Sequence, residues 1–183
     1  MIKAICFDVD GTLIDTSEYI YQSFEHSLEL HNYPIIEREE MRQMMGQTLQ
    51  DCYRAFTEIQ DVTDLMDAHR EFQLDNSDLA APFPNTLKTL ARLRNKGIAI
   101  AAITSRARAS AIETLEYLEV YPLIDYFVGL EDVSYAKPDP EGIIKALNSL
   151  GIHPADSVMV GDSPVDVEAG KNAKTRTIGV TYG

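Results

Sequence analysis

The sequence has few cysteines and no long hydrophobic run, and each shortage excludes a class of protein. Only two of the 183 residues are cysteine, and Cys6 and Cys52 lie far apart without zinc-ligand spacing. Two such residues do not make the disulfide framework of a small secreted domain. No apolar stretch approaches the roughly 20 residues that span a bilayer, and the N-terminal segment reaches an acidic residue too early for a signal peptide. We therefore expect a cytoplasmic protein with no membrane partner.

Positive charge is also scarce, above all in one segment. The chain carries 29 acidic and 16 basic residues, a net charge of -13. Residues 16–80 contain fourteen acids and four arginines but no lysine. Such a segment repels a phosphate backbone, so we expect no nucleic-acid partner. The simplest interpretation of the acidic segment is a solvated helical surface.

Apolar and β-branched runs alternate with helical patterns over most of the chain. In the helical patterns apolar residues recur every three or four positions, and two of these patterns end at a glycine, Gly97 and Gly151. Alternation of this kind predicts an α/β fold, a Rossmann-like parallel sheet with helices on both faces. The expected strands cover residues 2–7, 98–104, 126–128, 157–160 and 175–180.

The segment between the first two expected strands shows no strand pattern. It contains four helical stretches, separated by Pro34, Gly46 and a polar break near Asp61. We therefore predict a core formed by residues 1–15 and 81–183, interrupted by a small all-helical domain over 16–80. The helical stretches are 17–30, 37–46, 49–59 and 62–74.

Polar residues follow four of the expected strands at the point where each ends. Ligands bind beyond the carboxyl ends of the strands in an open parallel sheet, so these side chains should meet in one crevice. Taken singly, each has a simpler explanation: Asp162 could cap a helix and Lys137 could lie exposed on a turn. Their convergence favours a site. The set comprises Asp8, Asp10, Thr104, Ser105, Lys137, Asp162 and Asp166.

The residue types in this set suit phosphoryl transfer. Clustered carboxylates without nitrogen or sulfur ligands favour a hard cation such as Mg²⁺. Asp8 and Asp10 are two positions apart, so both project to one side of an extended chain. One carboxylate can attack phosphorus while the other protonates the leaving oxygen. A lysine and a hydroxyl can then stabilise the oxygens of the transferred group.

Four ordered motifs resemble those of the haloacid dehalogenase superfamily of phosphatases. They are the sequence DVDGT at 8–12, Thr104, Lys137 before PDP, and GDSPVD at 161–166. The resemblance covers nearly the whole chain. It implies a helical cap, residues 16–80, that closes over the site, and a loop from Gly11 to Asp15 that leads into it.

The resemblance also implies a role for each site residue. Asp8 is the nucleophile and Asp10 the general acid and base. Mg²⁺ is held by Asp8, Asp162 and the backbone carbonyl of Asp10, and Asp166 supports them from outside the ligand set. Thr104 and Lys137 take part in catalysis, and the phosphate-binding residues are Gly11, Thr104, Ser105 and Lys137.

Several functions remain open within this resemblance. The segments at 131–147 and 169–183 look most like phosphoglycolate phosphatases and related pyrophosphatases, so a small phosphorylated metabolite, phosphoglycolate first, is the expected substrate. A pyrophosphatase or a mutase similar to β-phosphoglucomutase is the alternative, although mutases often carry an acid where this chain has Gly161. Asp10 argues against dehalogenation.

Non-enzymatic alternatives are a catalytically silent phosphate-binding protein and a receiver-like protein. We expect a monomer or a weak homodimer.

Two further groups of residues are interpreted as lying outside the site. Arg106 and Arg108 follow the second motif and could contact substrate, but a solvated helix face is favoured. The four histidines, His26, His31, His69 and His153, show no catalytic or metal pairing and are interpreted as surface or cap residues.

Overall fold

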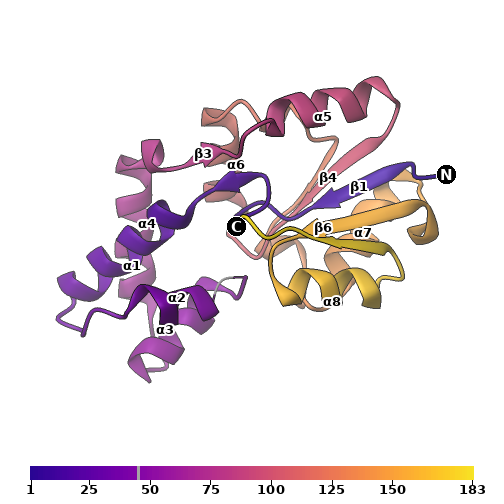
Figure 1. Ribbon diagram of the computed structural model, residues 1–183. Coiled ribbons are helices and arrows are strands. Elements are labelled where there is room, and N and C mark those ends of the chain that lie inside the picture. Colours follow the sequence, from indigo (N-terminus) through magenta and orange to yellow (C-terminus); the bar gives the residue numbers. More distant parts are fainter. Residues whose placement is uncertain (45) are drawn as a thin grey trace.

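A computed structural model describes residues 1–44 and 46–183 and shows a parallel sheet beside a group of helices (Figure 1). The five strands lie in the order β5-β4-β1-β6-β7, and all neighbouring pairs are parallel. This confirms the predicted α/β fold. The strands are β1 (Ala4–Phe7), β4 (Ala99–Ile103), β5 (Tyr126–Val128), β6 (Ser157–Gly161) and β7 (Arg176–Gly179).

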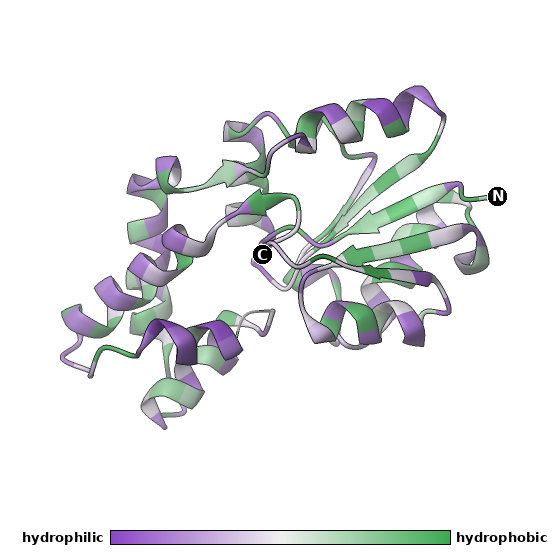
Figure 2. Cartoon of the chain, in the orientation of Figure 1, coloured by the Kyte–Doolittle hydropathy of each residue, from purple (hydrophilic) through white to green (hydrophobic). Residues whose placement is uncertain are grey.

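Helices cover both faces of this sheet. Alternate residues of a strand face opposite sides, so Phe7 packs in one apolar cluster with Leu90 and Leu115, and Cys6 packs in another with Leu147. The central strands are accordingly apolar throughout, whereas the helices are apolar on one side only (Figure 2). The helices are α5 (Thr86–Asn95), α6 (Arg108–Tyr117), α7 (Glu141–Leu150) and α8 (Pro164–Asn172), with short 3-10 turns at Tyr121–Leu123, Leu130–Asp132 and Pro154–Asp156.

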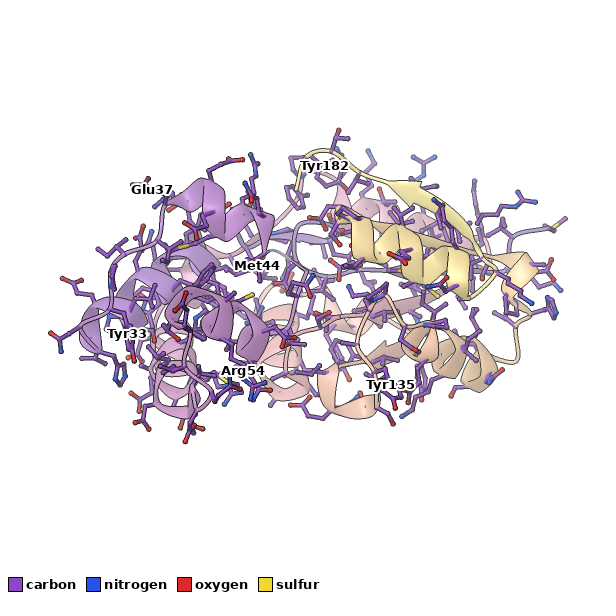
Figure 3. All side chains as sticks on the ribbon, turned by 90° about the horizontal axis from the view of Figure 1, so that it is seen from below. Tyr33, Glu37, Met44, Arg54, Tyr135 and Tyr182 are labelled. Carbon is purple, nitrogen blue, oxygen red and sulfur yellow. The ribbon has the colours of Figure 1, made fainter. Side chains whose placement is uncertain are left out.

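Residues 16–80 form four helices with an apolar cluster of their own. Phe24, Met41, Tyr53 and Leu65 are buried in this cluster. In Figure 3 Met44 lies on the side of this helical group that faces the sheet, whereas Tyr33 and Glu37 lie away from it. The elements are α1 (Ser17–Leu30), α2 (Arg38–Gln43), α3 (Leu49–Thr57), α4 (Thr63–Asp75) and a 3-10 turn at Ser77–Leu79. The second predicted helix, 37–46, is therefore longer than α2, and Met45 lies outside the described residues.

Where the chain enters and leaves the helical group, the structure adds a feature that the sequence did not predict. Two short strands, β2 (Ile14–Asp15) and β3 (Ala81–Pro82), pair in an antiparallel manner. Strands of two residues are too short to show an alternating pattern, and both lie just outside the predicted helical segment, residues 16–80. The pairing holds the two connections side by side. The backbone carbonyl of Leu13 adds to it by accepting the Thr86 hydroxyl at 3.0 Å.

None of the helices that the structure describes is long and apolar enough to cross a membrane.

Candidate active site

The turn that follows β1 places the first two acidic residues. The backbone N–H of Asp8 donates to the carbonyl of Val160 at 2.8 Å, so the residue stays in register with β6. The chain then turns at Gly11, whose φ of +78° favours glycine. A Cβ atom at this position would also lie 2.4 Å from a carboxylate oxygen of Asp162. Gly11 is therefore required twice, for the turn and for the close approach of Asp162.

Lys137 lies between two carboxylates at the bottom of the site. Its Nζ donates to Asp8 Oδ1 at 2.5 Å and to Asp166 Oδ1 at 2.6 Å, and its side chain is 5% exposed. The alternative of an exposed turn lysine is therefore wrong. Burial alone would lower the pKa of Lys137, but the two carboxylates raise it above its usual value. The lysine is held in its charged form.

Asp166 holds this lysine and the start of α8 together. Its Oδ2 accepts from the backbone N–H of Ser163 at 3.1 Å and from the Ser163 hydroxyl at 2.5 Å, while Oδ1 accepts from Lys137. Both oxygens of the buried carboxylate are thus occupied by protein donors. Ser163, and not Asp162, is the cap of α8. Asp162 is left free for another task.

The remaining carboxylate oxygens fit a hard cation. Asp8, Asp162 and Asp166 can each offer an oxygen within 4.8 Å of the others. Because Asp166 is saturated, the candidates are Asp8 Oδ2 and Asp162 Oδ2, which accept no hydrogen bond from residues 1–44 or 46–183. Burial raises the pKa of Asp162, and the Thr12 hydroxyl at 3.0 Å lowers it in part. Asp8 is buried and Asp162 half-buried, and two neighbouring carboxylates with free oxygens suit Mg²⁺.

Two hydroxyls follow β4 on the other side of Asp8. Thr104 Oγ1 accepts from the backbone N–H of Arg106 at 3.1 Å, which fixes the turn, while its own hydrogen has no acceptor among the described residues. Ser105 Oγ is buried and has no hydrogen-bond partner among the described residues. A buried hydroxyl without a partner is costly. A ligand oxygen would satisfy it.

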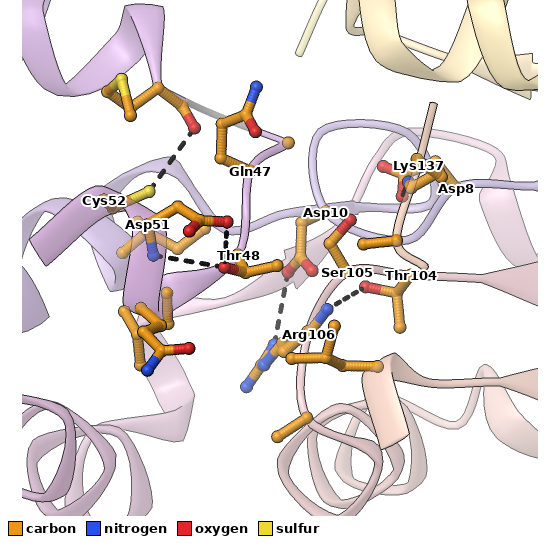
Figure 4. A pocket seen from close by; sticks show the side chains of 18 of the residues that line it. Asp8, Asp10, Gln47, Thr48, Asp51, Cys52, Thr104, Ser105, Arg106 and Lys137 are labelled. Atoms are coloured by element: carbon orange, nitrogen blue, oxygen red, sulfur yellow. Dashed lines mark hydrogen bonds and ion pairs between the residues drawn. The ribbon is translucent and has the colours of Figure 1, made fainter. Parts of the chain in front are cut away.

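These groups open into one cavity of about 940 Å³ between the sheet and the helical group. Figure 4 shows Thr48 of the helical group facing Asp10 and Ser105 of the core. The cavity is lined by six of the predicted site residues, Asp8, Asp10, Thr104, Ser105, Lys137 and Asp162, and Gly11 and Asp166 lie against Asp162 and Lys137. The helical group contributes Gln47, Thr48, Gln50, Asp51, Arg70 and Gln73 among others. The structure brings the predicted set together, and the assigned roles stay predictions.

Arg106 is a site residue that sequence reasoning placed wrongly. Its side chain is 12% exposed, and Nη1 lies 3.3 Å from Asp10 Oδ1. Nη2 donates to the Tyr19 hydroxyl of α1 at 2.9 Å. The solvated-face interpretation does hold for Arg108, which is 43% exposed and paired with Asp132. The sequence does contain a signal for this position. Ser110 and Thr114 lie four and eight positions beyond Arg106, so both hydroxyls are on one face of a helix and can hold the Arg106 side chain.

His69 is a second residue that the sequence gave no reason to select. It lies buried in the helical group and lines the cavity. Its ring nitrogens lie 3.0 Å from the Tyr53 hydroxyl and 3.0 Å from Gln73 Nε2. Burial, with a smaller effect of Arg106, lowers its pKa to about 3. A neutral imidazole is therefore part of the cavity wall at neutral pH.

Comparison with known proteins identifies the family. Residues 5–180 match the family model described as haloacid dehalogenase-like hydrolase. The chain belongs to this family. Pyrophosphatase PpaX of Bacillus pumilus is 36% identical over 184 residues, covering 99% of this chain and 84% of the relative, and PpaX of Bacillus cereus is 33% identical over 182 residues, covering 99% and 84%.

Solved structures agree with the family assignment. A haloacid dehalogenase-like hydrolase from Bacteroides fragilis superposes with a TM-score of 0.90 at 32% identity, covering 100% of this chain and 89% of the other. A candidate β-phosphoglucomutase from Thermotoga maritima gives 0.79 at 27% identity, covering 100% and 87%. The chain is thus a phosphatase of the haloacid dehalogenase-like family.

Replacing Lys137 by methionine should abolish most activity. Met keeps the length of the side chain but removes the charge that offsets Asp8, Asp166 and a bound phosphate. We expect kcat/KM for an aryl phosphate to fall about a hundred- to a thousandfold, as for other electrostatic donors. The matched control is Lys88→Met, an exposed lysine on α5. A rate within threefold of wild type in Lys137→Met, with folding verified by circular dichroism, would contradict this role.

The buried His69 should make stability depend on pH. Its pKa is lowered from 6.5 to about 3 on folding, so the unfolded chain binds the extra proton in that interval. The stabilisation is complete above pH 6.5 and is lost as the pH falls toward 3. By linkage, wild type should lose about 2 kcal/mol more free energy of unfolding between pH 7 and pH 5 than His69→Gln does.

Urea denaturation at the two pH values measures this difference. His153→Gln, at an exposed histidine, is the control and should behave as wild type. Equal pH dependence of wild type and His69→Gln would show that His69 does not titrate as described.

Proposed function

We propose that this phosphatase is a Mg²⁺-dependent phosphohydrolase that cleaves a small phosphate monoester through an aspartyl-phosphate on Asp8. The observation that carries the proposal is the arrangement around Asp8. One of its oxygens is held by Lys137 at 2.5 Å, and the other has no donor among the described residues and lies at a cavity that Asp10 also lines.

The residues that hold the phosphoryl group surround Asp8. Ser105 has an unpartnered buried hydroxyl, and Thr104 and Lys137 line the same cavity, so three donors can bind phosphoryl oxygens. Asp8, Asp162 and the backbone carbonyl of Asp10 would hold Mg²⁺, which supplies positive charge against the developing negative charge when it is bound. Phosphoryl transfer depends mainly on such positioning and neutralisation.

Two chemical steps follow from the positions of the two acids. Asp8 attacks phosphorus, the bond from phosphorus to the leaving oxygen breaks, and Asp10 gives its proton to that oxygen. Asp10 then takes a proton from water as the water attacks the aspartyl-phosphate. The products are the leaving alcohol, inorganic phosphate and free Asp8, so atoms and charges balance.

Phosphoglycolate is the favoured substrate because the helical group offers little positive charge to a larger anion. Of its arginines, Arg70 lines the cavity but is 43% exposed and paired with Asp67. Arg38 pairs with Glu18 at the surface. The helical group would act as a cap that closes over a small leaving group and excludes water.

Pyrophosphate is the second candidate. It is favoured by one observation, the identity of 33–36% with Bacillus proteins that carry the name pyrophosphatase PpaX. Its leaving group is phosphate and so carries more charge than glycolate.

Asp8→Asn should abolish turnover because an amide cannot attack phosphorus and binds a cation poorly. We expect phosphate release to fall at least about a thousandfold, as for the loss of other nucleophiles. Asp75→Asn, at an exposed position of α4, is the control. Chelation of Mg²⁺ should stop the wild-type reaction and readdition should restore it. Activity above a few percent in Asp8→Asn would remove Asp8 as the nucleophile.

A panel of metabolite phosphates decides the substrate. We expect kcat/KM to be highest for phosphoglycolate and second for pyrophosphate, with hexose phosphates and aryl phosphates below both, because the cavity accepts a small anionic leaving group best. Conversion of a hexose 1-phosphate to its 6-phosphate, without release of phosphate, would instead identify a mutase.

A further inference from the structure

The guanidinium of Arg106 is held in a fixed position at the edge of the cavity. Nε donates to Ser110 Oγ at 3.0 Å, and Nη2 donates to Thr114 Oγ1 at 2.8 Å and to the Tyr19 hydroxyl at 2.9 Å. Ser110 is in the first turn of α6 and Thr114 in the next, so both anchors belong to one rigid element. The Arg106 charge also lies over the Tyr19 ring at 5.0 Å. Four interactions thus fix this side chain.

One donor of this fixed guanidinium remains unused. Arginine has five N–H donors, and three of them, on Nε and Nη2, are bound as above. Nη1 carries the other two, and its only partner among residues 1–44 and 46–183 is Asp10 Oδ1 at 3.3 Å. Arg106 lines the cavity beside Asp10 (Figure 4). A mostly buried cation with one long ion pair is poorly compensated.

The other cations that line the cavity have closer ion pairs than Arg106 or are more exposed to solvent. Lys137 donates to Asp8, to Asp166 and, at 3.4 Å, to the Ile103 carbonyl, and it lies beside Asp8, where the transferred phosphoryl group would bind. Arg70 is 43% exposed and paired with Asp67. Among the described cavity residues, Arg106 therefore offers the positive charge that the leaving half of a substrate can still use.

We propose that Arg106 binds an anionic group on the leaving half of the substrate and so selects phosphate esters or anhydrides whose leaving group carries a carboxylate or a phosphate. The inference rests on the proposed function, which places Asp10 at the leaving oxygen. Because Nη1 lies next to Asp10, an anion two or three bonds from that oxygen reaches the free N–H. Arginine forms strong charge-assisted hydrogen bonds with both groups.

A carboxylate on the cavity wall opposite Arg106 limits the length and the charge of this anion. At the start of α3 the Thr48 hydroxyl donates to Asp51 Oδ2 at 2.6 Å, and both residues line the cavity. The Asp51 carboxylate disfavours a longer or more highly charged anion on the side of the helical group. Selection therefore favours a compact anion on the Arg106 side.

Two phosphonates that are not hydrolysed test this inference. 3-Phosphonopropionate carries a carboxylate in the place where phosphoglycolate has one, and propylphosphonate has a methyl group there. Each is measured as a competitive inhibitor of aryl phosphate hydrolysis with Mg²⁺. In wild type the carboxylate compound should bind about ten- to a hundredfold more tightly, the range expected of a hydrogen bond to a charged group.

Substitution of Arg106 should remove this preference. In Arg106→Met the ratio of the two inhibition constants should fall to within about threefold of unity, and Arg106→Lys should restore part of it because the charge returns without the fork geometry. Arg108→Met, two residues along and paired with Asp132 outside the cavity, is the control and should keep the wild-type ratio. An unchanged ratio in Arg106→Met would overturn the inference and leave Arg106 as a residue that only positions Asp10.

The outcome is separable from failure of the proposed function. If wild type releases no phosphate from any ester, the phosphatase proposal fails, and the same two phosphonates are compared by titration calorimetry. Equal binding of both compounds to an active wild type would overturn the inference about Arg106 while the phosphatase activity stands.

Discussion

The ion cluster of Lys137 with Asp8 and Asp166 is the interaction on which the rest of the site depends. Three charged groups are buried together, and burial of each alone would be very costly. Each is satisfied by the others: the lysine lies 2.5 Å from one carboxylate and 2.6 Å from the second. The cluster joins the end of β1, the turn before α7 and the start of α8.

Saturation within this cluster determines what remains free for chemistry. Asp166 has both oxygens occupied, so it supports Lys137 and does not compete for a cation. Asp8 and Asp162 each keep one oxygen that accepts no hydrogen bond from the part of the chain that the structure describes. The two cations of the site differ in pairing as well: Lys137 contacts two carboxylates, whereas Nη1 of Arg106 has one long contact, with Asp10, among the described residues. The groups available to a cation or a substrate are therefore those whose hydrogen bonds within the protein are incomplete.

The sequence predicted the core and the convergence of its acids because both follow from local patterns. The run at 157–160 predicts a strand, motif residues such as Asp8 and Asp162 directly follow strands, and parallel pairing brings strand ends together. Arg106 and His69 could not be assigned in this way. Their environment is created by contacts between separate helices or segments, Tyr19 with Arg106 and Tyr53 with His69. The periodicity of the sequence does not predict such contacts. The two-residue strands at Ile14 and Ala81 were not predicted for a related reason: each pairs with a strand more than sixty residues away.

The paired connections β2 and β3 have a consequence for how such proteins diversify. The helical group leaves the core and returns to it at one point, and it has an apolar cluster separate from those of the sheet. The length and sequence of the helices can therefore change without altering the distance between the chain ends that the core must join, and longer insertions cost little extra closure entropy. Mutational change can accumulate in the part that surrounds the leaving group while the acids and the lysine stay in register. In an architecture of this kind the reaction can be conserved while the substrate specificity changes.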